Sequence, residues 1–537
     1  MVLTGRFKRD RAVLLGIILV ALIFRLAWAD RIPGINGDEA DVAYQIRAWM
    51  DGLDSNWITP TGRFFSPFLV AMIIPIQKIF GPTFFALRLP AMLSGFIEVV
   101  LAFWLLPKAL GQRIGVLLAL LMCCMPGYIV QSRLIWDLSH AGIISILSVY
   151  CIWKRNLLGA LLTLAAAVII HKVNIFITPM ILIPFAWDWL ENGRARTGVK
   201  ISALCAMGVA GAIIAYLLSR NIPSEYGDLT HTAVLRAVMP WKFIPFFIHV
   251  VRLVTGVEFF PAPAHIAWLI LLDAAGMGLA FYLLWAGTKS LLKKKTDPEA
   301  RRTLSIVAAW AASVVAIYLV AGEYGIAGGH IFYVLGLGVP TLWVFLLLAQ
   351  EVLDNEEKLI SRSEMAASVF LAITAGFYFF PLLTSADGTD RMYLTSAQEP
   401  KQTAYEWIRS DFKARSANRR DPSPAQLEII ADDWWAYWPT VYLDSAYSNR
   451  AKVYHYELIV PRGLDERNVV TSENQLKEIF SRGGYAISIK GGLVDDLIAR
   501  TYPSTDVLIR KEIPGFSLPG TPERTVVSVW RLKSSGF

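Results

Sequence analysis

The sequence predicts a polytopic α-helical membrane protein that ends in an extracytoplasmic α/β domain. Of its 537 residues, 55% are hydrophobic and only 18% are charged, and the mean hydropathy is +0.47. A soluble domain carries about 25% charged residues, so a soluble enzyme, a disordered chain and a fibrous repeat are all disfavoured. The 18 Trp, 19 Tyr and 28 Phe residues suit a protein with two membrane interfaces, where amphipathic rings collect.

Apolar runs long enough to cross a bilayer recur along residues 1–383. A spanning helix needs roughly 20 mostly apolar residues. We expect about eleven spans, at about 13–29, 88–106, 114–131, 138–153, 157–170, 175–189, 200–218, 266–287, 304–321, 331–349 and 366–383. Two shorter segments within the first outside loop, residues 30–87, are expected to lie in the membrane interface. The first, 40–51, has apolar residues at helical spacing, and the second, 67–80, is apolar but short.

Basic residues between these runs predict the orientation of the chain in the membrane. The clusters around Lys108, Lys154, Arg194 and Lys293 all fall on the same side as the basic N-terminal segment. Cytoplasmic loops carry such an excess of Lys and Arg, so we expect a cytoplasmic N-terminus and, after an odd number of spans, an outside tail. The sequence has no Asn-x-Ser/Thr sequon and no cysteine in the tail, which favours a bacterial inner membrane with a periplasmic tail.

Residues 384–537 differ in character from the rest of the chain. This tail has 20 Lys and Arg against 20 Asp and Glu, so the whole net charge of +8 lies in the membrane part, and no nucleic-acid partner is needed to explain it. Short strands are expected at 427–431, 453–456, 486–490 and 507–510, with helices at 403–413 and 473–482, which indicates an α/β domain. We interpret the Asp432-Asp433 pair as a helix cap rather than a metal motif.

Charged residues recur in the turns that this topology places outside. A pair of acids, Asp38-Glu39, opens the helical segment after the first span. Further candidates lie in three other outside turns, namely Arg133, Asp137, His171, Lys172 and His330. First-turn acids also have a structural explanation, since capping and the helix dipole favour them, and interfacial charge can simply snorkel. Neither explanation accounts for a charge in every short outside turn, so we expect a polar site at the extracytoplasmic membrane edge.

The order of these motifs resembles the GT-C membrane glycosyltransferases, and within them the branch of lipid A aminoarabinose transferases and protein O-mannosyltransferases. The resemblance rests on Asp38-Glu39, Tyr44, Trp57-Ile58-Thr59-Pro60, Phe80-Gly81 and the Arg88-Leu89-Pro90-Ala91-Met92-Leu93-Ser94-Gly95 segment. Arg133 with Asp137 is similar to the second acidic motif of that branch, and His171-Lys172 to its Thr/His-Lys turn. The resemblance is strong over residues 1–190, weak to about 350, and only architectural in the tail.

Two positions depart from the pattern of the branch. Where the branch often has Lys-Pro-Pro, this chain has Phe65-Ser66-Pro67, so the lysine is absent and Arg63 is the candidate substitute. The usual Arg or Lys of a later motif is His330, in the segment His330-Ile331-Phe332-Tyr333-Val334-Leu335. Both departures concern contacts to the donor phosphate.

The resemblance implies a GT-C-like fold and an inverting transfer of one monosaccharide from an undecaprenyl-phosphate or similar polyprenyl-phosphate donor. The acceptor would be a hydroxyl of a lipid, glycan or protein on the extracytoplasmic face. In this interpretation Asp38 is the general base and Asp137 orients the acceptor or places a cation. The implied substrate-binding residues are Glu39, Arg63, Arg88, Arg133, His171, Lys172 and His330. Glu39 can instead cap the helix or hold a neighbouring cation. No organic cofactor is implied, and a divalent cation remains possible.

Other classes of function stay open on the sequence alone. A transporter or flippase of a lipid-linked or polar substrate would show broken helices or paired halves with polar groups at mid-membrane, and neither pattern is evident. The chain also lacks a Walker A motif and a Gly-x-Gly-x-x-Gly helix start, which argues against a nucleotide-sugar donor. A non-catalytic relative that binds glycan or protein through its tail is the third possibility. Glu98 and Asp273 lie inside predicted spans, where either a functional role or pairing with a polar neighbour would explain them.

Overall fold

The structure is a computed structural model. It describes residues 3–52, 66–135, 137–192, 241, 243–255, 266–321, 336–353, 356–375, 389–390, 395–396, 400–417, 426–447, 451–456, 469–470, 472–489, 492–514 and 525–533. The chain forms two compact units. The first comprises residues 1–27, 66–69 and 91–376, and the second comprises 28–65, 70–90 and 377–537. The predicted first outside loop is thus grouped largely with the tail.

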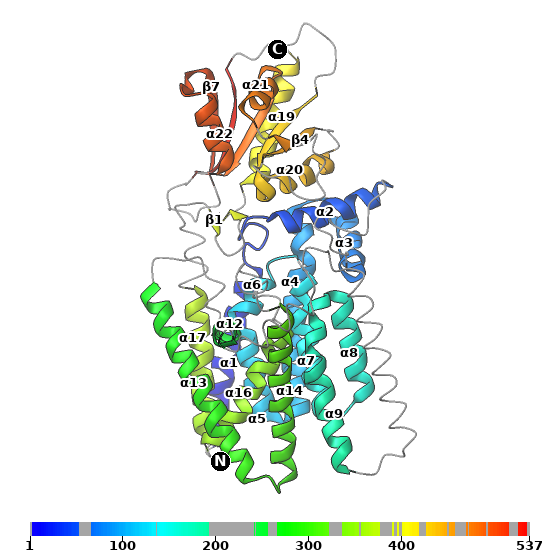
Figure 1. Ribbon diagram of the computed structural model, residues 1–537, viewed down its shortest axis with the longest axis vertical. Coiled ribbons are helices and arrows are strands. Elements are labelled where there is room, and N and C mark those ends of the chain that lie inside the picture. Colours follow the sequence, from blue (N-terminus) through cyan, green and yellow to red (C-terminus); the bar gives the residue numbers. More distant parts are fainter. Residues whose placement is uncertain are drawn as a thin grey trace. The chain divides into compact units, whose positions relative to one another are not determined.

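The first unit is a helical bundle (Figure 1). Its elements are α1 (Leu3–Leu26), α4 (Phe84–Leu110, from Ala91 onward), α5 (Gln112–Cys124), α6 (Pro126–Gln131), η1 (Asp137–His140), α7 (Ala141–Trp153), α8 (Leu157–Ile170), η2 (Lys172–Ile177), α9 (Thr178–Asn192), α12 (Phe243–Thr255), α13 (Ile266–Lys293), α14 (Pro298–Ala321), α16 (Gly338–Leu353) and α17 (Glu356–Ile373). The predicted span 114–131 is split in two, because Pro126 occupies the first position of α6, where a missing N–H is tolerated.

Long apolar stripes on the bundle helices are exposed. On α4, Leu93, Phe96, Val100 and Trp104 follow one another at helical spacing and are 45–55% exposed. Apolar stripes of this kind mark a membrane-facing or protein-facing surface. By length and composition, two of the described helices can cross a membrane, Phe84–Leu110 and Pro298–Leu319, and six further apolar helices are shorter. The predicted count of eleven spans is therefore not confirmed, and the span at 200–218 lies outside the described residues.

The second unit contains a six-stranded mixed sheet with helices on both faces (Figure 1). The strand order is β5-β4-β3-β6-β8-β7. The bounds are β3 (Glu428–Asp432), β4 (Lys452–Tyr456), β5 (Val469–Val470), β6 (Tyr485–Ile489), β7 (Leu508–Pro514) and β8 (Thr525–Leu532). The first three strands of this order and β6 run parallel, and β8 is antiparallel to β6 and β7. A separate two-stranded ribbon pairs β1 (Thr389–Asp390) with β2 (Thr395–Ser396).

Alternating side chains of the sheet fill two apolar layers. On one face, Ile430, Tyr454 and Ala486 pack with α21 (Glu473–Ser481) and α22 (Leu493–Thr501). On the other face lie α19 (Lys401–Ala417) and α20 (Asp433–Tyr447), where the ring of His455 meets that of Tyr437 at 5.2 Å. The predicted α/β character of the tail is confirmed, and each of the four predicted strands and both predicted helices overlaps an observed element.

Helix α2 (Gly37–Met50) packs against α20 within the second unit. Along α2, Ala40, Ala43 and Ile46 are fully buried. The ring of Tyr44 lies 5.9 Å from that of Trp438. We expected the apolar side of this segment to face the membrane interface, whereas a helix of the tail lies against it. The unit also contains α3 (Pro67–Phe80) from Val70 onward and the first turns of α4.

Candidate active site

The start of α2 is built by a reciprocal cap. The side chain of Asn36 accepts a hydrogen bond from the Glu39 N–H at 2.8 Å, and the Glu39 carboxylate accepts one from the Asn36 N–H at 3.2 Å. This capping box satisfies two of the four N–H groups that a helix start leaves open. The cap directs the Glu39 side chain into the protein interior, where Glu39 is fully buried. Asp38, the residue before it, is partly exposed. The two adjacent acids therefore occupy different environments.

Arg88 holds Glu39 and the loop before it in place. Its Nε and one terminal nitrogen donate to the two Glu39 carboxylate oxygens at 3.0 and 2.7 Å. Its other N–H groups donate to three backbone carbonyls, those of Ala29 at 2.8 Å, Pro33 at 2.6 Å and Gly34 at 3.3 Å. A guanidinium has five N–H donors, and these five contacts use all of them. Both Arg88 and Glu39 are 0% exposed.

The contacts of Arg88 and Glu39 fix the position of the Asp38 backbone. Because Arg88 gathers the carbonyls of residues 29–34 and Glu39 closes the cap, the backbone on both sides of Asp38 is held by buried charge-assisted hydrogen bonds, which are stronger than neutral ones. Asp38 is also in the first turn of α2, where the helix dipole stabilises a carboxylate. A carboxylate held at a partly open helix start can accept a proton from a bound hydroxyl group.

Within the first unit, the turn that carries Asp137 is closed by hydrogen bonds to its neighbours. Arg133 is fully buried and donates to the carbonyls of Phe24 at 2.6 Å and Ala27 at 2.8 Å, at the C-terminal end of α1. Ser139 donates to the carbonyl of Leu134. Cations are favoured at a helix C-terminus, so Arg133 has a structural task in addition to any contact with substrate.

Helix α4 holds the other end of the same turn. The Nδ1 atom of His140 and the hydroxyl of Ser94 are 2.5 Å apart. Glu98, one helical turn further along α4, lies with its carboxyl group directly over Gly142, in the first turn of α7: a Cβ atom added to Gly142 would lie 2.4 Å from the carboxyl carbon. A buried acid at a helix start is stabilised by the helix dipole. Glu98 thus lies beside the start of α7, but its Oε2 atom has no hydrogen-bond partner among the described residues, so a functional role and a structural one both stay open.

The third predicted turn joins α8 to η2. His171 is the C-cap of α8 and is buried, and its N–H donates to the Ala167 carbonyl at 3.0 Å. The side-chain amide of Asn174 donates to the same carbonyl at 2.8 Å. Lys172 is the first residue of η2. Asn174 was not among the sequence candidates. Its position two residues after His171-Lys172 is the sequence feature that could have pointed to it.

The remaining candidates fall as follows. Arg63 and His330 lie outside the described residues. Asp38, Glu39 and Arg88 belong to the second unit, and Arg133, Asp137, His171 and Lys172 to the first. Their meeting in one pocket stays a prediction.

Metal-type clusters are not found in the described part of the chain, where no three His, Cys, Asp or Glu residues come together. Asp432, which the sequence analysis weighed as a metal motif or a cap, is buried at the end of β3 and accepts from the N–H groups of Ile489 at 3.1 Å and Val494 at 3.3 Å. It therefore caps α22. The sequence had suggested a cap for the helix that immediately follows Asp432, and the capped helix lies about 60 residues later.

Comparisons with known proteins give likenesses at low sequence identity. No family model and no curated protein matches the sequence. Among solved structures, the chain is similar to ArnT from Cupriavidus metallidurans in the apo state, with 13% identity over 98% of both chains and a TM-score of 0.40. The same protein bound to undecaprenyl phosphate gives 14% identity over 98% of both chains and a TM-score of 0.38.

A second likeness is to the oligosaccharyltransferase of Archaeoglobus fulgidus in complex with Zn and sulfate. It has 17% identity over 89% of this chain and 68% of that chain, with a TM-score of 0.43. Both proteins are GT-C enzymes. At these TM-scores the likenesses carry no argument about the reaction, which rests on the residues. In its sequence motifs, the chain resembles the GT-C membrane glycosyltransferases.

Proposed function

We propose that the protein transfers one monosaccharide from a polyprenyl-phosphate carrier, such as undecaprenyl phosphate, to a hydroxyl group outside the cytoplasm. The acceptor hydroxyl attacks the anomeric carbon in a single displacement, which inverts the configuration at that carbon. Asp38 takes the hydroxyl proton as general base, and the carrier phosphate leaves with the electrons of the broken glycosidic bond. The observation that carries this proposal is the fully bonded Arg88–Glu39 pair beside a partly exposed Asp38.

The pair supports a catalytic use of Asp38 because it holds the loop on either side of this partly exposed carboxylate. A loop that only needed a helix cap would be served by Asn36 and Glu39 alone, which already form the cap. The buried Arg88 contacts add rigidity around the next carboxylate. Preorganised geometry of this kind lowers the cost of reaching the transition state.

The leaving phosphate requires cations at the other side of the reacting carbon. In this proposal Lys172 is the main contact, with Arg63 and His330 beside it. Arg133 and His171 hold the turns that present Asp137 and Lys172, as their hydrogen bonds within the first unit suggest. Glu39 and Arg88 act as positioning residues for Asp38. Asp137 orients the acceptor, or helps to hold a divalent cation where one takes part.

A transfer assay with full-length protein tests the proposal. The protein is reconstituted in vesicles with a panel of undecaprenyl-phosphate pentoses, hexoses and amino sugars, and sugar transfer to cell-envelope acceptors is measured. We expect one donor class to react, and Asp38→Asn to lower the rate by about 10²–10⁴-fold, which is the usual contribution of a general base. Asp30→Asn is the matched control, because this acid of the same loop is also partly exposed and pairs with Arg31.

Two results would overturn parts of the proposal. If Asp38→Asn transfers sugar at the wild-type rate, Asp38 is not the base. If the wild-type protein transfers no sugar from any donor of the panel but moves a lipid-linked substrate across the vesicle membrane, the enzyme assignment fails and the transporter alternative replaces it.

A further inference from the structure

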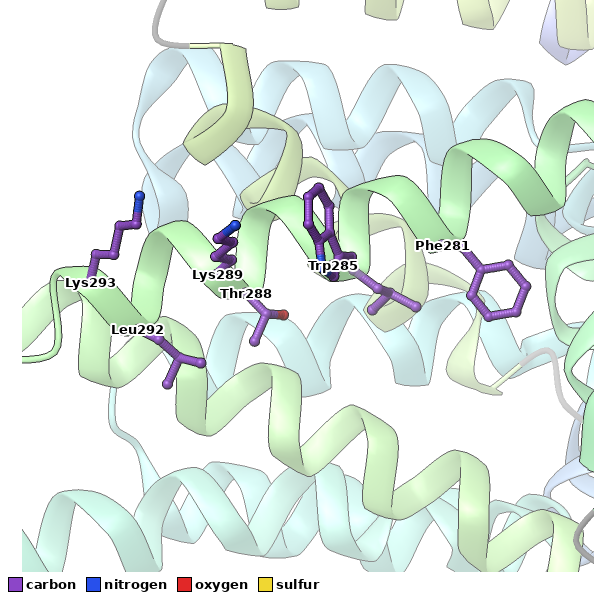
Figure 2. A pocket seen from close by; sticks show the side chains of 7 residues that line it. Phe281, Trp285, Thr288, Lys289, Leu292 and Lys293 are labelled. Atoms are coloured by element: carbon purple, nitrogen blue, oxygen red, sulfur yellow. The ribbon is translucent and has the colours of Figure 1, made fainter.

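A groove runs along one face of α13 (Figure 2). Its volume is about 660 Å³. Among the residues that the structure describes, those that line it run from Phe281 to Lys293 on this helix at spacings of three and four positions, and none of them is a candidate site residue. Residues at these spacings share one helix face, so they form a continuous stripe along α13.

The first part of the stripe is apolar and open. Phe281 is 52% exposed and Trp285 is 64% exposed. From Phe281 to Lys289 the helix rises about 12 Å at 1.5 Å per residue. Half of a bilayer's hydrocarbon core is about 15 Å thick. The apolar part of the stripe can therefore follow most of the length of one lipid acyl chain.

The last part of the stripe carries two positive charges. Lys289 and Lys293 are both exposed and stand one helical turn apart, where like charges repel each other. Within the described part of the chain, neither lysine has a carboxylate in ion-pair distance. The next lysine, Lys294, differs, because its ammonium group lies 2.9 Å from a carboxylate oxygen of Glu351. The charge of the lysine pair is thus uncompensated, whereas that of Lys294 is neutralised.

An aromatic ring joins the two parts. The Lys289 ammonium lies 4.9 Å from the centre of the Trp285 ring. Trp104 and Lys108 form a similar pair one turn apart at the C-terminal end of α4, with 4.4 Å between the ammonium and the ring centre. Trp rings collect at the level of the lipid headgroups. By the basic residues of the sequence, both helix ends are predicted to face the cytoplasm.

We propose that this face of α13 binds an anionic phospholipid of the cytoplasmic leaflet. The headgroup phosphate lies between Lys289 and Lys293, Trp285 packs at the headgroup level, and an acyl chain follows the stripe toward Phe281. The phosphate relieves the repulsion between the two lysines, and a zwitterionic lipid does so less well because it brings its own cation. This site is independent of the proposed transfer reaction.

Native mass spectrometry of the full-length protein in detergent tests the site. Phosphatidylglycerol and phosphatidylcholine are titrated in parallel, and the affinity of each for the protein is measured. For Lys289→Gln with Lys293→Gln we expect about a thirtyfold loss of phosphatidylglycerol affinity, which corresponds to about 1 kcal/mol per lysine at an anionic lipid surface. Lys294→Gln is the matched control and should change the affinity less than twofold. Arginine at both positions should preserve binding.

Three results would overturn the site. The first is an unchanged phosphatidylglycerol affinity in the double glutamine variant, and the second is an equal loss in Lys294→Gln. The third is displacement of phosphatidylglycerol by an equal concentration of undecaprenyl phosphate, which would assign the groove to the sugar carrier instead. Phosphatidylcholine binding should be unchanged in the lysine variants, which reports that they have kept their fold. Trp285→Ala should lower it, because the ring packs at the headgroup level of either lipid.

Discussion

The guanidinium group of Arg88 and the carboxylate of Glu39 form a fully buried, two-point ion pair across 49 residues of sequence. Every N–H of the arginine and both oxygens of the glutamate have protein partners. In a buried pair with all polar atoms hydrogen-bonded, the attraction and the hydrogen bonds offset the cost of desolvation. The loss of one partner leaves a buried charge without compensation. The pair therefore links the loop before α2 firmly to the first turns of α4.

Arg88→Gln should destabilise the protein by about 3–5 kcal/mol, because it leaves the Glu39 charge buried and unpaired. The stability of Arg88→Lys should lie between that of Arg88→Gln and that of the wild type. An ammonium group has three donors and cannot form the planar two-point contact. The measurement is the thermal unfolding of the full-length protein in detergent. Arg31→Gln is the control, because Arg31 is 57% exposed and its pair with Asp30 is a surface contact. Equal unfolding midpoints for Arg88→Gln and Arg31→Gln would contradict a stabilising role of the Arg88–Glu39 pair.

Gly142→Ala should destabilise the bundle by about 1–3 kcal/mol, the usual cost of overpacking. The added methyl group would overlap the Glu98 carboxyl group and push it from the first turn of α7. Gly278, in the interior of α13, has open space where a Cβ atom would be added. Gly278→Ala should therefore leave the stability unchanged or raise it slightly. Thermal unfolding of both variants provides the comparison. A Gly142→Ala protein as stable as Gly278→Ala would show that Glu98 does not occupy this place.

Local patterns in the sequence predicted the parts whose structure depends on neighbours along the chain. Apolar runs marked α4, α7 and α8 closely, and short strand-like segments marked β3, β4 and β6. The capping box was also readable, because Asn36 and Glu39 have the spacing of that motif, although we had weighed only the adjacent acids. Pro126 likewise signalled the break between α5 and α6.

Contacts between distant segments could not be predicted in the same way. The carbonyls that Arg88 collects lie more than 50 residues before it, and nothing in their sequence distinguishes them from other loop carbonyls. The helix that packs against α2 is a second example, since the apolar side of α2 fits a membrane interface and a protein helix equally well. Only the approach of α20 decides between these two, and α20 lies about 400 residues further along the chain.

Tyr44→Ala and Trp438→Ala should be coupled in stability by about 0.5–1.5 kcal/mol, the range for aromatic pairs in contact. A double-mutant cycle on the full-length protein measures this coupling. The control cycle combines Tyr44→Ala with Trp530→Ala, because Trp530 packs on the α21 and α22 face of the sheet. That cycle should be additive within about 0.5 kcal/mol. Additivity in the first cycle would mean that α2 and α20 do not pack through these rings.

Asp444, on α20, makes the stability of the tail depend on pH. Burial raises the pKa of its carboxyl group, and the hydrogen bonds from the Tyr405 hydroxyl and the Ala451 N–H oppose this rise only in part. A raised pKa in the folded state means that the folded protein binds the proton more tightly than the unfolded chain. The contribution of Asp444 to stability is therefore most favourable below the unfolded pKa, and it declines as the pH rises through the folded pKa.

Asp444→Asn should remove this decline, because the amide keeps an acceptor for Tyr405 and cannot ionise. We expect the difference in unfolding midpoint between variant and wild type to shift in favour of the variant as the pH rises from about 4 to 7, around the ordinary range of a carboxyl pKa. Asp506→Asn, at an exposed position, is the control and should show no such trend. A pH-independent difference for Asp444→Asn would mean that its carboxyl group titrates alike in the folded and unfolded states.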